Sequence, residues 1–367
     1  MYKFPPILKI EFSINTHHFF YLCKMNREER ILAFCKLGTL LTNAYNSRES
    51  ELQAAIQKAS FQNPWFTENN SLQAFRGITH MLAEHKLRSW LQSYSFPEKA
   101  HSRIAVIMAG NIPMVGFHDA LCVLISGNTL IAKLSSKDTV LLEYVFSKLI
   151  EIDERFANHI QICTHTLPEF DAIICTGSNN SSRYFEYYFG KYPHIIRKNR
   201  NSVGVICEHD TAETYSKISH DIFSYFGLGC RNVSKLYIPE SVDIRTILNS
   251  FKPDKSLVEH TKYMNNYEYQ KSIYLVGQQE HLDTGYLLVA QSTQLYSPLA
   301  VLVYEPYTNI LDVQQTLETH KDSIQCIVCS ENLFYKENTI PGTTQVPELY
   351  NYADDIDTLS FILNLPV

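Results

Sequence analysis

The chain has 367 residues, of which 45% are hydrophobic and 19% charged, and its net charge is −6. This composition is typical of a well-packed globular protein of about two domains and excludes a disordered chain. Because Lys and Arg are scattered and the net charge is negative, we expect no nucleic-acid partner. Nine cysteines at irregular spacing do not suggest a disulfide framework, and they favour a reducing, cytoplasmic location. Polar residues interrupt the longest apolar region, residues 104–126, so we expect no membrane span.

The first 24 residues differ from the rest of the chain. Pro5, Pro6 and Glu11 interrupt the apolar stretch that a secretory signal needs, so this segment is not a signal peptide. Asn26, with Glu29 three residues later, predicts a capping box at the start of a helix. We therefore expect Met25 to be the natural start and residues 1–24 to be either upstream read-through or a loose extension.

Helical patterns come first and alternating strands follow. Residues 50–60 and 72–94 have the spacing of helices, which we expect to cover one side of a sheet. The predicted strands are RIAVIMAG, TLIAKLS, IQICTH, AIICTG, HIIRKN and SVGVICE, and the predicted helices between them lie near residues 114–126, 138–152 and 180–190. Such alternation is typical of an α/β protein with a mainly parallel sheet, whose ligands bind at the carboxyl ends of the strands.

A cysteine stands at the centre of DIFSYFGLGCRNVSKLYIP, residues 221–239. The amphipathic run in this stretch stops at Gly227 and Gly229, and a strand-like run begins just after Cys230. Glycines let the backbone approach a ligand, and nearby N–H groups together with Arg231 are expected to lower the pKa of the thiol. The alternative for any single cysteine is a small buried hydrophobe. The flanking glycines and Arg231 favour a nucleophile.

Three turns follow predicted strands. Asn111, between Gly110 and a proline, can present its side-chain NH2 to an oxyanion, although asparagine in such a turn is often a cap. Lys133, followed by Ser135-Ser136-Lys137, suits a ribose or a phosphate, or else a solvated surface. The turn that starts with Gly177 and Ser178 can bind phosphate through backbone N–H groups, although it has neither the GxGxxG nor the Walker pattern.

Across residues 30–365 the sequence resembles the acyl-CoA reductase family typified by LuxC, the fatty-acid reductase component of bacterial bioluminescence, within the aldehyde dehydrogenase superfamily. Four segments carry the resemblance, in the same order: AGNIPMVGFHDALCVLISGN, AKLSSKD, CTGSNN followed by RYFEYYFGKYPHIIRKNRNSV, and FGLGCRNVSKLYIP. The resemblance implies a Rossmann-type nucleotide-binding domain and an α/β catalytic domain. It also implies that Cys230 is the nucleophile and Asn111 the oxyanion donor. By the same resemblance, Lys133 contacts the adenosine ribose or its 2′-phosphate, and Gly177 and Ser178 form the turn by the cofactor.

The departures from the superfamily pattern bear on the chemistry. Hydrolytic aldehyde dehydrogenases carry a water-activating glutamate about one strand before the cysteine, whereas the matching stretch here, Arg197–Asn201, has no carboxylate. An acyl enzyme is then poorly set up for attack by water, which favours exchange with a thiol or reduction. Gln294 replaces a second glutamate, which holds the nicotinamide ribose in the superfamily. Ser136 stands where NAD-preferring relatives often place a glutamate that repels a 2′-phosphate, so the resemblance favours NADPH, with NADH as the alternative.

From these observations we predict a nucleotide-binding domain over residues 25–200, a catalytic domain over 201–334, and a segment, 335–367, that returns to the first domain or to a neighbouring subunit. The predicted function is NADPH-dependent reduction of a long-chain acyl-CoA, or of another acyl thioester such as an acyl-protein, to an aldehyde. A hydrolytic NAD(P)-dependent aldehyde dehydrogenase and a non-catalytic scaffold subunit of an acyl-transfer complex are the alternatives. An acyl-activating protein and a second copy of the chain are the expected partners.

Other residues that could carry chemistry have simpler interpretations. Cys326 and Cys329 lie in an apolar run without a second ligand pair, so we expect no metal site. We expect His118 and Asp119 to serve packing or helix polarity rather than proton transfer. The aromatic run over residues 184–189 is expected to form core and domain contacts, with an acyl channel as the alternative.

Overall fold

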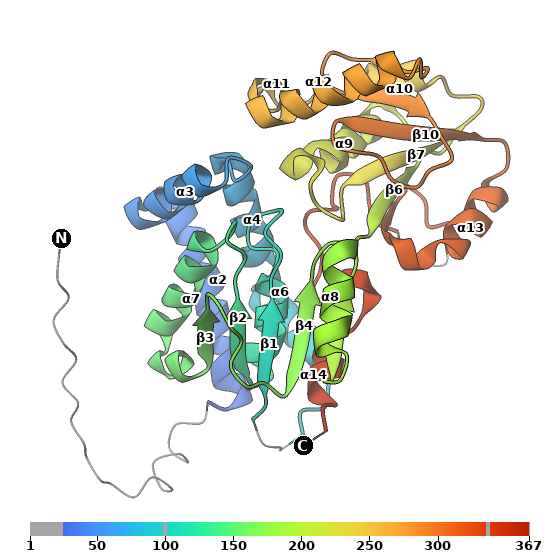
Figure 1. Cartoon of the computed structure of the whole chain (residues 1–367). Coiled ribbons are helices and arrows are strands. Elements are labelled where there is room, and N and C mark those ends of the chain that lie inside the picture. Colours follow the sequence, from blue (N-terminus) through green and yellow to red (C-terminus); the bar gives the residue numbers. More distant parts are fainter. Residues whose placement is uncertain (1–24, 98–100, 335–337, 367) are drawn as a thin grey trace, which may run out of the picture.

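Two β-sheets, each covered by helices, make up the protein (Figure 1). The computed structural model describes residues 25–97, 101–334 and 338–366. Both sheets are mainly parallel, so the predicted α/β class is confirmed. The predicted N-terminal extension, residues 1–24, lies outside the described residues.

The first sheet has the strand order β3-β2-β1-β4-β5, and all its strands are parallel. The strands are β1 (Arg103–Ile107), β2 (Thr129–Lys133), β3 (Ile160–Cys163), β4 (Ala172–Thr176) and β5 (His194–Arg197). From β1 the chain adds β2 and β3 on one side and then β4 and β5 on the other. The carboxyl ends of β1 and β4 therefore flank a topological switch point, where open α/β sheets bind ligands.

Helices cover both faces of this sheet. One face packs against the early helices, as predicted, and also against the two helices that follow β1 and β2. These helices are α2 (Arg27–Ser47), α3 (Ser50–Gln62), α4 (Glu68–Met81), α5 (Glu84–Gln92), α6 (Phe117–Ile125) and α7 (Val140–Ile152). The other face packs against α8 (Asn179–Phe189). Successive strand residues alternate between the faces, so Ile104 and Val106 join the large core while Ala105 faces α8.

The helical pattern over residues 72–94 belongs to two helices, α4 and α5, and not to one. Ala83 between them is extended, with φ −60° and ψ 130°. The break lies at a close contact with α2. Leu82 packs so tightly on Gly38 that a Cβ at Gly38 would lie 2.8 Å from the Leu82 Cβ. Sequence periodicity does not reveal this contact, because α2 is distant along the chain.

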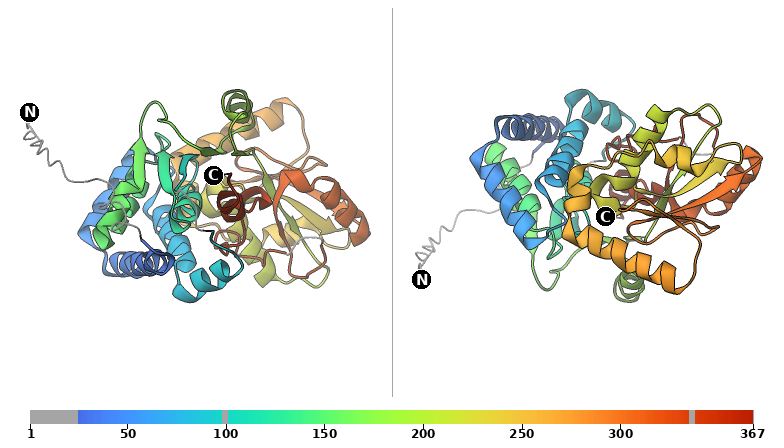
Figure 2. Two further views of the ribbon diagram at one scale, coloured as in Figure 1. Left: turned by 90° about the horizontal axis from the view of Figure 1, so that it is seen from below. Right: turned by 90° about the horizontal axis from the view of Figure 1, so that it is seen from above.

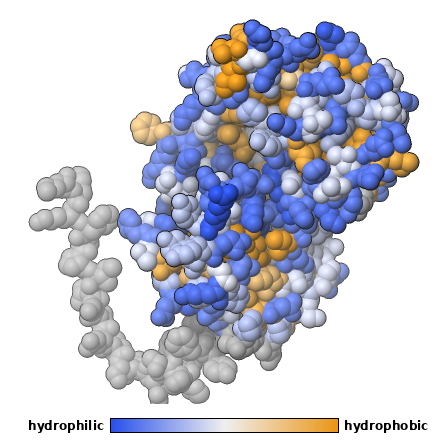
Figure 3. All heavy atoms as spheres, turned by 45° about the vertical axis from the view of Figure 1, so that its right-hand side comes forward, coloured by the Kyte–Doolittle hydropathy of each residue, from blue (hydrophilic) through white to orange (hydrophobic). Residues whose placement is uncertain are grey.

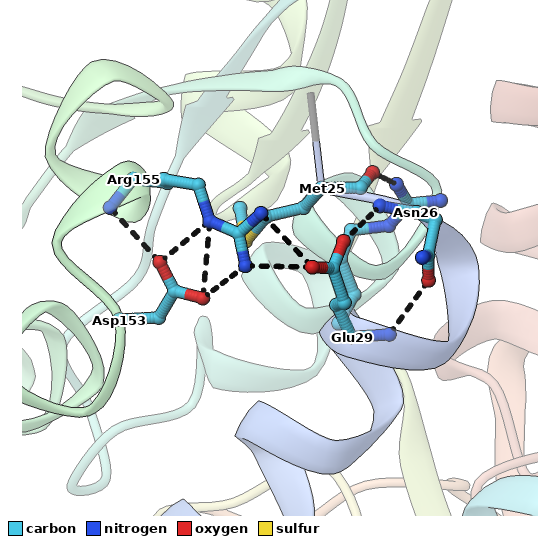
Figure 4. Close-up of polar contacts among 6 residues, drawn as sticks. Met25, Asn26, Glu29, Asp153 and Arg155 are labelled. Atoms are coloured by element: carbon cyan, nitrogen blue, oxygen red, sulfur yellow. Dashed lines mark hydrogen bonds and ion pairs between the residues drawn. The ribbon is translucent and has the colours of Figure 1, made fainter. Parts of the chain in front are cut away.

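The predicted capping box at the start of α2 is confirmed (Figure 4). The Glu29 N–H donates to Asn26 Oδ1 at 2.9 Å, and the Asn26 N–H donates to Glu29 Oε2 at 2.7 Å. Glu29 also pairs with Arg155 at 3.1 Å, and Arg155 pairs with Asp153 at 2.7 Å. The start of α2 is therefore tied to the turn that follows α7.

The aromatic run on α8 is only partly buried. Phe185 and Phe189, one helical turn apart, pack against the strands. Tyr184, Tyr187 and Tyr188 are 66%, 82% and 60% exposed, so the prediction that they form core contacts was wrong. Residues four apart share a helix face, and the three tyrosines lie on the opposite face.

The second sheet has the order β11-β6-β7-β10-β9-β8, and β8 alone is antiparallel to its neighbour. Its strands are β6 (Asn201–Val205), β7 (Val233–Pro239), β8 (Leu282–Asp283), β9 (Leu288–Gln291), β10 (Val301–Tyr307) and β11 (Ile324–Val328). One face packs against α9 (Ala212–Phe223) and α10 (Ile244–Leu248). The other packs against α13 (Ile310–Thr319) and α12 (Thr261–Val276), the latter with the short α11 (Lys255–Glu259).

The C-terminal segment contacts elements around both sheets. The Asp221 carboxylate of α9 accepts hydrogen bonds from the Gly342 and Thr344 N–H groups, at 2.6 and 3.1 Å. Further on, α14 (Thr358–Leu363) packs against α6, with Leu359 and Ile362 buried in the core of the first sheet. Figures 1 and 2 show this red segment beside the first sheet.

The molecular face in Figure 3 is largely hydrophilic, and its hydrophobic patches are separate from one another. A bilayer crossing needs about 20 consecutive apolar residues in a helix. Over the described ranges, no helix has the length and apolar character for such a crossing.

Candidate active site

The loop that carries Cys230 begins with an unusual backbone turn. After α9 ends at Phe223, the residues Tyr225, Phe226 and Gly227 have φ values of 50°, 60° and 78°. The left-handed region costs free energy for residues other than glycine, and such conformations concentrate at functional sites. This turn reverses the chain, so that Cys230 lies just before β7, as predicted from the glycines.

A buried asparagine organises the loop from inside. The Gly229 N–H donates to Asn232 Oδ1 at 2.8 Å, and Asn232 Nδ2 donates to the carbonyls of Asp221 and Ser224, at 2.9 and 2.8 Å. Asn232 thus ties the end of α9 to the residue before Cys230. This role of Asn232 was not predicted from the sequence, because no spacing rule marks an asparagine two residues after a cysteine.

The structure brings Asn111 to the Cys230 loop. Asn111 is exposed in the turn after β1, and its Nδ2 donates to the Leu228 carbonyl at 2.8 Å. From the other side, the Ser202 hydroxyl of β6 donates to the Cys230 carbonyl at 2.9 Å. The Cys230 loop is therefore held between the carboxyl edge of the first sheet and the start of β6.

The other predicted site residues lie at the end of β2 or just after β2 and β4, the two neighbours of β1, and so lie along the same sheet edge. Lys133 Nζ donates to the Thr164 carbonyl, and Ser136 is exposed. Ser178 caps α8, accepting from the Ser181 N–H at 3.2 Å. Within the described ranges, Asn111 forms a hydrogen bond to the Cys230 loop. Lys133 and Ser178 form theirs to other residues.

The α8 end of this edge fits a phosphate group. The turn at Gly177 opens an 11-residue helix at its N-terminus, where N–H groups and the helix dipole favour phosphate. A Cβ at Gly177 would lie 2.9 Å from the side chains of Phe185 and Ser181. The turn can pack this closely on α8 only because glycine has no side chain.

The charge state of the thiol differs from the prediction. Cys230 is exposed, while Cys35 is half-buried and the other described cysteines are buried. The residue is exposed as a whole, but the surrounding protein desolvates its thiol, and this desolvation raises the pKa of Cys230 more than Arg231 lowers it. The expected lowering of the pKa was therefore wrong. Arg231 is also engaged elsewhere, donating to the Asn351 carbonyl at 2.6 Å and to Cys326 Sγ at 3.2 Å.

Arg197, in the stretch that lacks the glutamate, has a structural role. Its guanidinium is 3% exposed and pairs with both carboxylate oxygens of Asp119, at 2.5 and 2.9 Å. It also donates to Thr358 Oγ1 at 2.7 Å, which joins β5, α6 and α14. His118 lies 3.0 Å from the Leu349 carbonyl through Nε2. These contacts agree with the packing role expected for His118 and Asp119.

A cavity of about 1060 Å³ lies elsewhere, beside β9 and β10. Gln294 and Tyr296 line it, and Cys230 does not. The structure therefore does not place Gln294 in one cavity with the thiol. Nor do the described residues include any group of three His, Cys, Asp or Glu side chains that could hold a metal ion.

Asp138 links the loop after β2 to the turn that carries Asn111. It is 2% exposed, and its Oδ2 accepts from the Met114 N–H at 2.6 Å. Met114 has φ 56°, and within the described part of the chain Asp138 Oδ1 finds no hydrogen-bond partner. Burial raises the pKa of Asp138 to about 7.

Replacing Asp138 with asparagine is expected to stabilise the protein at high pH. Because the folded-state pKa of Asp138 lies above its ordinary 3.8, the unaltered protein loses stability as pH rises from about 4 to about 7, by at most about 4 kcal/mol. The asparagine side chain would still accept from the Met114 N–H without ionising. We expect the stability gain of Asp138→Asn, measured by denaturant unfolding, to grow from pH 5 to pH 8. An equal gain at both pH values would contradict this charge effect.

Comparisons with known proteins agree with this architecture. The family profile described as acyl-CoA reductase (LuxC) matches residues 46–349. The comparison with curated proteins found no match. Among solved structures, the chain is similar to aldehyde dehydrogenase 21 from Physcomitrella patens in complex with succinate, at 12% identity over 84% of this chain and 74% of that chain, with a TM-score of 0.62.

Two further structures show the same likeness. One is the Mycobacterium tuberculosis aldehyde dehydrogenase complexed with NAD+, at 12% identity over 83% of this chain and 73% of that chain, with a TM-score of 0.61. The other is a mutant of Pseudomonas syringae aldehyde dehydrogenase C in complex with NAD+ and octanal, at 10% identity over 90% and 85%, with a TM-score of 0.59. At such identities the likeness shows the fold alone, which is that of the aldehyde dehydrogenases.

Proposed function

Because the chain belongs to the LuxC acyl-CoA reductase family, we propose that it reduces an acyl thioester, either a long-chain acyl-CoA or an acyl-protein, to an aldehyde through an acyl enzyme on Cys230. The observation that carries this proposal is the contact between the Asn111 turn and the Cys230 loop, 2.8 Å from Asn111 Nδ2 to the Leu228 carbonyl. This contact supports the proposal because it joins the Asn111 turn to the loop that carries the exposed Cys230, at the sheet edge where a dinucleotide would bind.

In this mechanism Cys230 Sγ attacks the thioester carbon. The second Nδ2 hydrogen of Asn111 and the backbone N–H of Cys230 stabilise the oxyanion. The carbon–sulfur bond to coenzyme A then breaks, the thiol proton of Cys230 ends on the leaving sulfur, and the acyl group stays on Cys230. A reduced nicotinamide cofactor, when bound, supplies the hydride. The aldehyde leaves as its bond to Sγ breaks, and the Cys230 thiolate that is released takes a proton from water.

Four residues at the edge of the first sheet would hold the cofactor. Lys133 and Ser136 are proposed to face the adenosine ribose, and Gly177 and Ser178 the phosphates. Ser136 is exposed and carries no charge that would repel a 2′-phosphate. NADPH is therefore the proposed cofactor, and NADH is the alternative.

The proposal is tested by incubating the purified protein with acyl-CoAs of graded chain length and either NADPH or NADH. Absorbance of the reduced cofactor and formation of aldehyde are followed together. With acyl-CoA present we expect the absorbance of the reduced cofactor to fall and aldehyde to form. We expect kcat/KM to be higher with NADPH than with NADH. A higher value with NADH would overturn the cofactor choice alone, whereas no turnover and no acylation of Cys230 would favour the scaffold alternative.

We expect the acyl enzyme to persist when no cofactor or thiol is present. The stretch Arg197–Asn201 has no carboxylate to activate water, and neutral water is a weak nucleophile without such a base. An acyl-CoA pulse, followed by mass spectrometry of the Cys230 peptide, measures the lifetime of the adduct. Added NADPH or free coenzyme A should discharge it quickly, and rapid loss in plain buffer would restore the hydrolytic alternative.

A further inference from the structure

A buried carboxylate holds one end of the turn that carries Asn111. Asp138 is 2% exposed, and its Oδ2 accepts from the Met114 N–H at 2.6 Å. At the other end of the turn, the Met108 N–H donates to the Lys133 carbonyl at 3.0 Å. Both contacts come from β2 or from the loop after it, so this neighbouring segment sets where the turn lies.

Between these two contacts the backbone of the turn has little to hold it. Among the residues that the structure describes, the N–H groups of residues 109–112 find no hydrogen-bond acceptor, and Pro113 has no N–H to donate. Met114 has φ 56°, a conformation that costs free energy at residues other than glycine and is kept where the surroundings require it. The hydrogen bond to Asp138 meets that requirement.

The loop after β2 also packs closely on the turn. A Cβ at Gly110 would lie 2.7 Å from Ser135 Cβ and 3.2 Å from Lys137 Cβ. The Asp138 N–H donates to the Ser135 carbonyl at 2.9 Å, which closes this loop on itself. A closely packed loop therefore presents the Asp138 carboxylate to the turn.

The middle of the turn faces the Cys230 loop. Asn111 Nδ2 donates to the Leu228 carbonyl at 2.8 Å. Ile112 packs beside Gly229, where an added Cβ would lie 3.6 Å from Ile112 Cδ1. A shift of the turn would therefore move the Asn111 amide relative to the loop that carries the nucleophile candidate.

We propose that Asp138 is a positioning residue for the oxyanion site: through the Met114 N–H it holds the turn so that the Asn111 amide meets the oxyanion formed when Cys230 attacks the acyl carbon. The inference rests on the proposed function. In this role Asp138 accepts a hydrogen bond and transfers no proton. The ionised carboxylate, the neutral carboxyl and an asparagine carboxamide all offer an oxygen that accepts.

The first test removes the acceptor. Asp138→Leu and the smaller Asp138→Ala both leave the Met114 N–H without its partner, and either variant suffices if the other does not fold. Acylation of Cys230 by acyl-CoA is measured by rapid quench and mass spectrometry. A misplacement of about 1 Å costs about 100-fold in rate, so we expect acylation to slow by about that factor, with the half-saturating acyl-CoA concentration nearly unchanged. Asp138→Asn should restore most of the rate, and equal slowing by all three variants would overturn the proposal.

A double-mutant cycle tests whether Asp138 acts through Asn111. Asn111→Ala alone should slow acylation by about 100- to 1000-fold, the usual cost of losing an oxyanion donor. If Asp138 positions this amide, adding Asp138→Leu to Asn111→Ala should slow acylation by less than about threefold more, because residues that act as a unit are not additive. Two effects that multiply in full would overturn the proposal.

Alkylation of Cys230 by iodoacetamide forms no oxyanion, so we expect its rate to be the same in all these variants. A loss of alkylation in parallel with acylation would show that Asp138→Leu disturbs the thiol itself, and the proposal would then be overturned. This measurement separates a misplaced Asn111 amide from a damaged nucleophile.

Asp153→Leu is the matched control for loss of stability. Asp153 Oδ1 accepts from the Arg155 N–H at 3.1 Å, in the connection between α7 and β3. This connection lies at the amino edge of the first sheet, whereas the Asn111 turn lies at the carboxyl edge. We expect a lower melting temperature and an unchanged rate of acylation. Slowing equal to that of Asp138→Leu would assign the effect to stability and overturn the proposal.

Failure of the proposed function would look different. The unaltered protein would then take no acyl group from acyl-CoA, although iodoacetamide would still alkylate Cys230. Crystal structures of the unaltered protein and of Asp138→Leu in that case test the positioning alone. An Asn111 amide displaced from the Leu228 carbonyl in the variant would support the role of Asp138, and an amide that stays in place would overturn it.

Discussion

Replacing Cys230 with alanine is expected to abolish acyl labelling and NADPH oxidation, with a loss of roughly a thousandfold or more, as for other covalent nucleophiles. The fold should stay intact, because the side chain is exposed. The loop is held through the Cys230 carbonyl by Ser202, and through Asn232, whose side chain stays in place. The measurements are mass spectrometry after an acyl-CoA pulse, cofactor absorbance, and thermal unfolding of the variant.

Cys35→Ala is the matched control for this experiment. Cys35 is half-buried on α2, so it is the next most accessible of the described cysteines. We expect its removal to leave labelling and turnover unchanged. Labelling that disappears with Cys175 or Cys207, both buried, would refute Cys230 as the nucleophile.

Replacing Arg197 with glutamate is expected to destabilise the protein by about 3–5 kcal/mol, the usual cost of breaking a buried ion pair. Arg197 is the first residue of the stretch that matches the superfamily glutamate motif, so this change would place a glutamate within that stretch. In the structure, however, it would set a second carboxylate against Asp119 in a site where Arg197 is 3% exposed. It would also remove the hydrogen bond to Thr358 that joins β5 to α14. Denaturant unfolding measures the loss, and we expect no gain in thioester hydrolysis.

Arg183→Glu makes the same chemical change at an exposed position on α8, so it controls for the change in net charge. We expect it to alter stability by less than about 0.5 kcal/mol. A folded Arg197→Glu variant with raised hydrolysis and normal stability would show that the Asp119 pair is dispensable. This single substitution would then be enough to turn the protein into a thioester hydrolase.

Several features of the fold were predictable because they depend on neighbours in the chain. The alternation of short apolar runs with amphipathic ones after Arg103 predicted a parallel α/β sheet, since side-chain periodicity follows from local backbone geometry. The capping box at Asn26 and the turn before Cys230 depend on three or four adjacent residues. Four motifs in order were enough to indicate the family.

Other features depend on residues that only the tertiary structure brings together. The break between α4 and α5 lies where Leu82 meets Gly38, and the exposure of the α8 tyrosines depends on which helix face the strands cover. The pKa of the Cys230 thiol illustrates the same limit, because adjacent Arg231 predicted a lower value while protein from several segments desolvates the thiol and raises it. Arg197 and Asp119 form a buried ion pair although they lie far apart along the chain, and no spacing rule connects them. Local sequence patterns therefore determined the elements, the order of the motifs and the nucleophile candidate. Burial and the pairing of charges were decided by the tertiary structure, because desolvation and Coulomb interactions depend on distance in space and not on separation along the chain.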